Sequence, residues 1–307
     1  MKRSLRFFVL SALLSTVPLC ADNFEEEGIY AGENIQDDSP SPFKLEVAGD
    51  YVERAKFKTS YLDHQQLQFS EVGSKATMAF YYDACNLEGA VAGIGYTYTH
   101  LGWDDNPYFD QEDFNTVNFY LEGFSGRLNN WFWKGQFMLN INAEYFNINQ
   151  YATYDLLLWG RYNYCDNLGL NIGFLAQTGM KIDRVFPVLG VDWQMKKDWK
   201  INLVFPVNIS AVYAIDECWS LAAVGRMFDS RQRVGKKANI PRGIFEYRNV
   251  GVELALNYAC NSYITANVHA GSTLGGSLRI AERHRHHKHR LKLESAGYFG
   301  GKVELSF

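Results

Sequence analysis

The chain has 307 residues and a formal net charge of −4, and 47% of its residues are hydrophobic. It carries no basic patch or stripe of the kind that binds nucleic acid, so a nucleic-acid partner is not expected. Beyond the N-terminal segment, no run approaches the roughly 18 consecutive apolar residues of a transmembrane helix. The 19 Tyr, 21 Phe, 7 Trp and 26 Gly, with only 7 Pro, instead favour many strands and turns.

Residues 1–21 have the pattern of a secretory signal peptide. Three cations within the first six residues precede an apolar segment that ends at Leu19, and Ala21 is a small residue suited to cleavage. A lipoprotein alternative would use Cys20, but Leu19 stands where a lipobox carries a small residue. Cleavage after residue 21 would leave 286 of the 307 residues and change the net charge from −4 to −7, since three cations and no acid are lost.

Residues 22–42 are acidic and rich in turn-forming residues, which predicts a flexible periplasmic leader. From Phe43 onward, apolar and polar residues alternate with a period of two, the pattern of β-strands. The alternating stretches approach the roughly 9–11 residues that a tilted membrane strand needs. The clearest are residues 43–51, 136–145, 170–177, 250–258 and 264–270.

The polar faces of these strands decide between two β architectures. A soluble sandwich also alternates, but repeated Asn, Gln, Thr, Glu and Lys opposite aliphatic runs fit a wet lumen on one side and lipid on the other. Aromatic residues at strand ends predict interfacial girdles. We therefore expect an all-β, transmembrane, antiparallel up-and-down barrel over residues 43–307. Its expected lumen-lining charges are Glu122, Glu144, Arg161, Asp192, Lys200, Glu253, Lys302 and Glu304.

The connections between strands alternate between short turns and longer polar segments, as in bacterial barrels with both termini in the periplasm. The longer segments include residues 229–247 and 273–296, which are expected to be outer loops. The count is about 14 strands if the chain reverses near Pro206. If Val204–Tyr213 is instead one bent strand, the count is 12.

Four cysteines recur in short, Tyr-preceded turns: Cys85, Cys165, Cys218 and Cys260. An exported protein meets an oxidising compartment in which disulfides persist. Cys218 and Cys260 lie in successive turns on the same rim, so they are the pair that an intramolecular disulfide would join. Linkage to another envelope protein and unpaired turn cysteines are the alternatives.

Arg279–Lys292 is a basic, histidine-rich segment in the last expected outer loop. Three interpretations remain open. His284, His286 and His287 are candidate transition-metal ligands, although the surrounding cations oppose metal binding. The cations are candidate ligands for lipopolysaccharide phosphates or another anionic polymer. The third is a solvated loop without a role. The candidate anion-binding residues are Arg283, Arg285, Lys288 and Arg290.

Motifs of soluble enzymes are absent from the sequence, including GxSxG, HExxH, phosphate-binding Gly-rich loops and CxxC. His64, His100, Asp104 and Asp105 fall in the first two outer loops, where loop composition accounts for them as well as catalysis does. We expect no enzyme activity and no cofactor.

The segment Pro187–Leu221 resembles a family of uncharacterised outer-membrane β-barrel proteins of Gram-negative-type bacteria. The features that carry the resemblance are Pro187, Gly190, Trp193, Trp199, Leu203, Phe205-Pro206, Tyr213 and Trp219. It implies fold and location only, because no activity comes with the family.

The last residues, Gly297–Phe307, alternate and end on an aromatic residue, as do the final strands that the outer-membrane assembly machinery recognises. We expect this strand to pair with residues 43–51 and close the barrel, and Phe307 to act as the assembly signal. The expected location is the outer membrane, with the lipid bilayer and the assembly machinery as partners. The expected function is a passive pore for small solutes; the alternative is a surface-binding or structural envelope protein that uses residues 279–292 and the rim cysteines.

Overall fold

The computed structural model describes residues 42–59, 61–62, 64–145, 147–180, 183–235, 238–282 and 288–307. The predicted signal peptide and nearly all of the predicted leader therefore lie outside the described residues. Within these ranges, no helix is long and apolar enough to cross a membrane.

The described chain is almost entirely β-structure, as expected, with a single four-residue helix, α2 (Ile148–Tyr151). The strands are β1 (Phe43–Lys56), β2 (Gln66–Asp83), β3 (Glu88–Trp103), β4 (Asp113–Ser125), β5 (Trp131–Asn142), β6 (Ala152–Cys165), β7 (Leu168–Gly179), β8 (Arg184–Lys196), β9 (Trp199–Phe205), β10 (Asn208–Ala214), β11 (Trp219–Arg233), β12 (Ile244–Asn261), β13 (Ile264–Ala281), β14 (Lys288–Lys292) and β15 (Gly297–Ser306).

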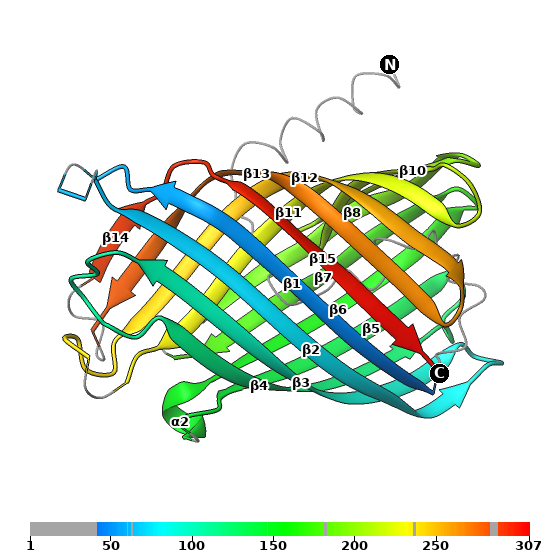
Figure 1. Cartoon of the computed structure of the whole chain (residues 1–307). Helices are drawn as coiled ribbons and strands as arrows, with labels where there is room; N and C mark the ends of the chain where they lie inside the picture. Colours follow the sequence, from blue (N-terminus) through cyan, green and yellow to red (C-terminus); the bar gives the residue numbers. More distant parts are fainter. Residues whose placement is uncertain are drawn as a thin grey trace, which may run out of the picture.

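Fourteen of the strands form a closed antiparallel ring, and the short β14 is added to the outer part of β13 (Figure 1). The ring closes between β1 and β15, with Lys44 opposite Ser306 and Val52 opposite Tyr298. This confirms the expected pairing of the first and last strands. The chain also reverses at Pro206, between β9 and β10, so the count of 14 is confirmed and the alternative of 12 is wrong.

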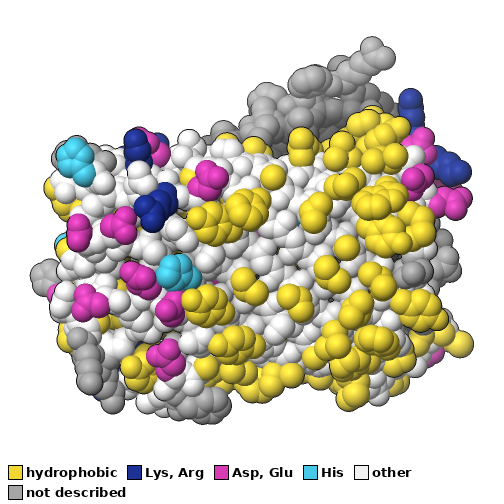
Figure 2. Space-filling model, in the orientation of Figure 1, with side chains coloured by type: hydrophobic (Ala, Val, Ile, Leu, Met, Phe, Trp, Pro, Cys, Tyr) yellow, Lys and Arg dark blue, Asp and Glu magenta, His cyan; other side chains and the backbone are white. Residues whose placement is uncertain are grey.

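The outer surface of the ring is apolar. Residues that alternate on the strands leave Val47, Ile94, Leu121, Ile172 and Leu254 exposed, although a soluble protein would bury them. On the face shown in Figure 2, hydrophobic side chains cover much of the wall, and charged side chains are concentrated toward the two ends. Such a continuous exposed apolar surface fits contact with lipid.

Aromatic side chains cluster where the short turns lie, which we call the inner end of the barrel; the longer connections define the outer end. Trp131 packs on Trp133 with ring centroids 5.4 Å apart, and Trp199 packs on Tyr213 at 4.9 Å. Trp219 and Tyr258 form a similar pair at 4.9 Å. Amphipathic rings prefer the boundary between lipid and water, so this rim fits one of the predicted girdles.

Two expected outer loops include long continuations of the neighbouring strands. Within residues 229–247, β11 continues to Arg233 and β12 begins at Ile244; within 273–296, β13 continues to Ala281 and β14 follows. The loop prediction was wrong for these strand portions because they lack a regular lipid-facing apolar stripe: charged residues dominate 229–233, and glycines interrupt the alternation at 275–276. Strands that leave the membrane wall have no need of such a stripe.

The reason that β11 leaves the wall lies in its neighbours. β9 and β10 have seven residues each, whereas β8 has 13 and β11 has 15. Among the described pairings, the last contact of β11 with β10 joins Gly225 to Ile209, so the outer half of β11 has no neighbour on that side. An open strand edge facing lipid is costly because its backbone groups find no partners. The outer halves of β11 and β12 instead turn into the lumen.

The bend occurs at irregular positions in β12 and β13. The register of these strands shifts between Asn249 and Gly251, and β-bulges of this kind bend a strand. A side chain at Gly276 would place its Cβ 2.3 Å from the backbone oxygen of Arg248, so only glycine allows this close approach. Gly275 beside it has a φ of +94°, which also favours glycine.

Candidate functional site

The outer halves of β11 and β12 form a hairpin across the lumen, which we call the inserted hairpin (residues 226–235 and 238–250). Gln232 Nε2 donates a hydrogen bond of 3.3 Å to Oγ1 of Thr116 in β4. β11 and β4 are seven strands apart in either direction around the ring, so they are opposite one another. The ring of Phe245 lies 4.8 Å from that of Phe114, also in β4. The hairpin therefore reaches the far wall.

One face of the inserted hairpin is aromatic and packs against β1–β4. Tyr247 stacks on Phe69 with centroids 4.3 Å apart, and Phe245 stacks on Phe109 at 5.5 Å. These rings belong to a cluster of buried apolar residues that also includes Val52 and Leu101. Complete burial of such a side chain contributes about 1.5–3 kcal/mol. This face holds the hairpin against the wall.

The other face is charged and lies against β8. Arg184 of β8 forms ion pairs with Asp229, at 3.3 Å, and with Glu246. Arg248 Nε lies 2.8 Å from Glu246 Oε1. The side chains of Asp229 and Glu246 are only 2% and 5% exposed. Because buried ion pairs tolerate few geometries, this network fixes where the hairpin sits more than it adds stability.

A second charged cluster lies at the bend. Arg226 of β11 contacts Asp50 of β1 at 3.1 Å and Glu253 of β12 at 2.7 Å. His269 of β13 approaches the same Asp50 carboxylate at 2.7 Å. Four side chains from four strands thus meet inside the lumen.

The tip of the hairpin rests on the connection between β3 and β4, beside which it lies in Figure 1. The backbone N–H of Gly235 donates to Gln111 Oε1 at 3.0 Å, and that of Ile240 donates to the carbonyl of Tyr108 at 3.2 Å. Burial raises the pKa of the Tyr108 hydroxyl above its usual value, and the hydrogen bond with Tyr61 adds to the effect. The hairpin is therefore held at its tip, along both faces and at its base.

Seven of the eight predicted lumen residues lie on the lumen side of their strands. Six of them form ion pairs: Glu122 with Lys134 (3.0 Å), Arg161 with Asp192 (3.4 Å), Glu304 with Lys44 (3.3 Å), Lys302 with Glu46 (3.0 Å) and Glu253 with Arg226 (2.7 Å). Lys200 lies on the lumen face of β9, opposite Gln194 and Val212. The prediction for Glu144 was wrong. β5 ends at Asn142, so Glu144 lies exposed in an outer connection, where it accepts a hydrogen bond from Asn115.

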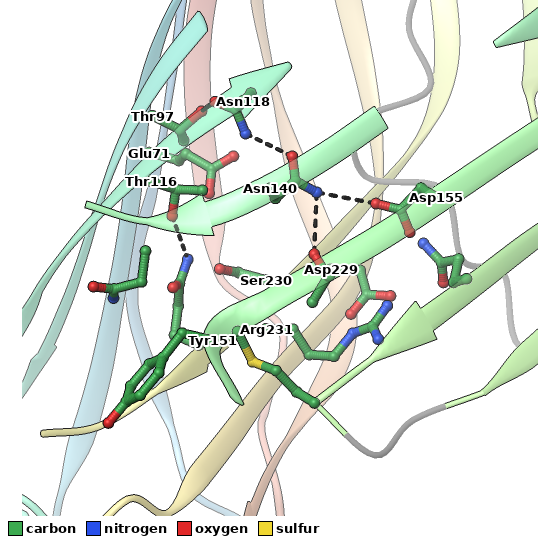
Figure 3. A pocket seen from close by; sticks show the side chains of 15 residues that line it. Glu71, Thr97, Thr116, Asn118, Asn140, Tyr151, Asp155, Asp229, Ser230 and Arg231 are labelled. Carbon is green, nitrogen blue, oxygen red and sulfur yellow. Dashed lines mark hydrogen bonds between the residues drawn. The ribbon is translucent and has the colours of Figure 1, made fainter. Parts of the chain in front are cut away.

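A small polar pocket separates β11 of the inserted hairpin from the opposite wall (Figure 3). The wall side carries amides and hydroxyls from β3–β7, together with Glu71 and Asp155. The hairpin side carries Asp229, Ser230, Arg231 and Gln232. The guanidinium of Arg231 lies near both the Asp229 and Asp155 carboxylates. Sequence reasoning missed this pocket, since the hairpin residues were expected in a loop.

The remaining predicted sites lie mostly at the ends of the barrel. Residues 283–287, with Arg283, His284, Arg285, His286 and His287, are outside the described residues, as is the side chain of Lys288. Arg290 is exposed on β14. The metal and anion hypotheses for this segment therefore stay predictions, and across the described residues no cluster of three or more metal-ligating side chains occurs.

Cys218 and Cys260 are joined by a disulfide across the turns that flank β11 and β12 at the inner end, in agreement with the expected pairing. Cys85, in the turn after β2, and Cys165, the last residue of β6, are exposed thiols at the same end. The sequence also offered His64, His100, Asp104 and Asp105 as a catalytic grouping, and the contacts of two of these residues do not support it. His100 bonds to Asp113 at 2.7 Å, and Asp104 pairs with Arg54 at 3.7 Å.

Phe307 is exposed beside the first residue of β1. Its backbone N–H donates to the carbonyl of Phe43 at 2.8 Å, and the two rings lie 6.2 Å apart. The last residue is thus placed at the seam where the ring closes. Its role as an assembly signal stays a prediction.

The closed ring, the apolar outer wall and the charged interior define an outer-membrane-type β-barrel protein. Residues 145–299, half of the chain, match a family described as a domain of unknown function, DUF6268, and the chain belongs to this family. The segment whose resemblance was noted in the sequence lies within that match.

Relatives occur in Chlamydia and are described only as uncharacterized proteins. One from Chlamydia pneumoniae is 25% identical over 293 residues, 90% of each chain. One from Chlamydia muridarum is 23% identical and covers 86% of this chain and 87% of its own. The crystal structure of the COG4313 outer membrane channel from Pseudomonas putida F1 is 8% identical with a TM-score of 0.50, covering 90% of this chain and 99% of that one. This last similarity concerns the fold alone.

Proposed function

We propose that the protein is a channel for small solutes in the outer membrane of a Gram-negative-type bacterium, with the inserted hairpin narrowing the outer half of its lumen. The observation that carries the proposal is the polar pocket between the hairpin and the opposite wall. A ring of 14 strands encloses room for a lumen. The hairpin fills part of it, and the polar pocket beside the hairpin is the part of the proposed passage that the structure describes.

The chemistry of the interior supports passage of water-soluble molecules. The inner half of the lumen is lined by ion pairs such as Lys134 with Glu122 and Arg161 with Asp192. Paired charges keep the wall hydrated without a strong net field, whereas an unbalanced ring of one sign would select ions. A solved structure with the same overall fold, from Pseudomonas putida F1, is described as an outer membrane channel, which is consistent with the proposal.

The inserted hairpin narrows the proposed passage, and this determines the conductance and size limit that we expect. The inserted hairpin contacts the far wall at Thr116 and Phe114, so solutes must pass beside it. We therefore expect a small conductance and a sharp size limit, in place of the wide pore that an empty ring of this size would form.

Planar-bilayer recording of the purified full chain tests the proposal. Folding is checked first by heat-modifiable gel migration, since a closed barrel migrates faster before boiling. Discrete conductance steps from folded protein are expected. A folded barrel that inserts into the bilayer without any conductance steps would overturn the channel proposal.

A further inference from the structure

We infer that the pocket beside the inserted hairpin is a binding site for a neutral polyhydroxylated solute, such as a monosaccharide or a small polyol. The inference rests on the proposed channel function and names the solute class. It follows from how the polar groups of the pocket are held, which of their atoms have partners, and which charges stand among them.

The wall of the pocket is held in place by a chain of hydrogen bonds that crosses four strands. Thr97 donates to Asn118 at 2.9 Å, and Asn118 Nδ2 donates to Asn140 Oδ1 at 2.7 Å. Asn140 Nδ2 in turn donates to Thr153 Oγ1 at 3.1 Å and to Asp155 Oδ2 at 3.0 Å (Figure 3). Side chains fixed in this way need little further ordering when they bind a ligand.

Several polar atoms of the pocket lack a hydrogen-bond partner within the protein. Among them are Nδ2 of Asn142, Oε1 of Gln177 and Nη1 of Arg231. Asn142 and Gln177 are only 2% and 6% exposed. Buried polar groups are normally paired, so these atoms mark where a ligand or ordered water completes the site.

The chemistry of these atoms indicates what the ligand must offer. The amide nitrogen of Asn142 and the guanidinium nitrogen of Arg231 donate, whereas the amide oxygen of Gln177 accepts, so a fitting ligand both donates and accepts hydrogen bonds. Hydroxyl groups do both. An ammonium group only donates, and a carboxylate or phosphate only accepts, so neither satisfies the whole set.

The charges of the pocket also exclude anions. Glu71, Asp155 and Asp229 line it, with Arg231 as the single guanidinium. An anion would meet an excess of carboxylates. A neutral polyol can bridge Asp155 and Arg231 without altering this balance, because a carboxylate accepts from a hydroxyl while a guanidinium donates to it.

The experiment compares three solutes with the same carbon skeleton: glucose, the anion gluconate and the cation glucosamine. Each is added to single channels in planar bilayers, and its binding to the detergent-solubilised barrel is measured by titration calorimetry. We expect glucose to interrupt the ion current and to bind, and we expect gluconate to do neither. Glucosamine should be weaker than glucose, because its ammonium group cannot accept.

Two variants test the site itself. Gln177→Met removes the amide, with its acceptor oxygen and the donor that bonds to Asp155, with little change of shape. Asn142→Asp removes a donor while keeping the oxygen that accepts from the backbone of Glu144 and Tyr145. Each should weaken glucose binding about tenfold, as expected for the loss of a buried polar contact. Gln136→Met is the matched control, since Gln136 is buried in β5 but does not line the pocket. It should change binding less than about twofold.

The outcomes separate this inference from the channel proposal. A conducting channel that treats the three solutes alike, or in which Gln177→Met matches Gln136→Met, overturns the binding site and leaves the channel standing. A folded barrel without conductance overturns the channel, and calorimetry then decides the site alone. Absence of glucose binding in that case overturns both.

Discussion

Gln232 of β11 donates a hydrogen bond to Thr116 of β4 across a distance of 3.3 Å, although these strands stand on opposite sides of the ring. A contact of this kind requires one strand to leave the wall. The cause lies in β9 and β10, whose seven residues each are too few to accompany β11 to the outer end. Because these two strands are short, β11 crosses the lumen and narrows it.

Removing the inserted hairpin should open the barrel. Replacement of residues 230–247 by a short Gly-Ser turn is expected to raise single-channel conductance several-fold, because the segment that bridges the lumen is lost. Planar-bilayer recording measures the change. Shortening residues 104–107, in the connection between β3 and β4, is the control and should leave conductance near the wild-type value. Equal conductance of the hairpin deletion and wild type would show that the hairpin does not set the pore width.

Phe245→Ala should destabilise the barrel by about 3–5 kcal/mol, the usual cost of truncating a fully buried aromatic residue. Phe245 is completely buried between Phe109 and Phe114. Phe119, which is 39% exposed on the lipid-facing surface, provides the matched control, and Phe119→Ala should cost much less. Urea unfolding in detergent measures both. Similar losses for the two variants would argue against a packed hairpin core.

Arg226→Leu should be strongly destabilising, by about 3 kcal/mol, since it leaves the carboxylates of Asp50 and Glu253 without their shared cation. Arg127→Leu is the control. Arg127 pairs with Glu88 at the inner rim with its side chain 61% exposed, and such surface pairs contribute at most about 1 kcal/mol. Unfolding midpoints of both variants decide the matter, and indistinguishable midpoints would contradict the prediction.

Thiol labelling should reveal the disulfide between Cys218 and Cys260. Without reductant, a maleimide reagent is expected to modify Cys85 and Cys165, and reduction should expose two further thiols. Cys218→Ser should then free Cys260 and lower stability by about 2–4 kcal/mol, as is usual for a lost disulfide. Cys85→Ser should change neither. Four reactive thiols in the unreduced protein would contradict the pairing.

Deletion of Phe307 should reduce the amount of assembled barrel more than deletion of residues 104–107 does. The last residue sits at the seam, bonded to Phe43, and the final strand must reach β1 before the ring can close. Outer-membrane levels and heat-modifiable migration measure assembly. If both deletions accumulate to the same level, Phe307 is not an assembly signal.

Much of the wall was predictable from the sequence. Segments such as 264–270 and 297–307 alternate strictly, since one side meets lipid and the other water, and this fixes both strand identity and the facing of Lys302 and Glu304. The short, cysteine-containing turns likewise indicated Cys218 and Cys260 as partners. The reversal at Pro206 was one of two predicted outcomes, and it makes the ring 14 strands.

The interior was decided by tertiary structure. Residues 229–247 look like a polar loop because both faces of the inserted hairpin are covered, one by aromatic rings from β2 and β4 and one by Arg184 of β8. The alternation of residues in the sequence cannot indicate that a strand packs against the opposite wall of the barrel. Asp229 and Arg231 line the pocket only because β11 crosses the lumen. β11 turns away from lipid because its outer half has no partner strand on the β10 side.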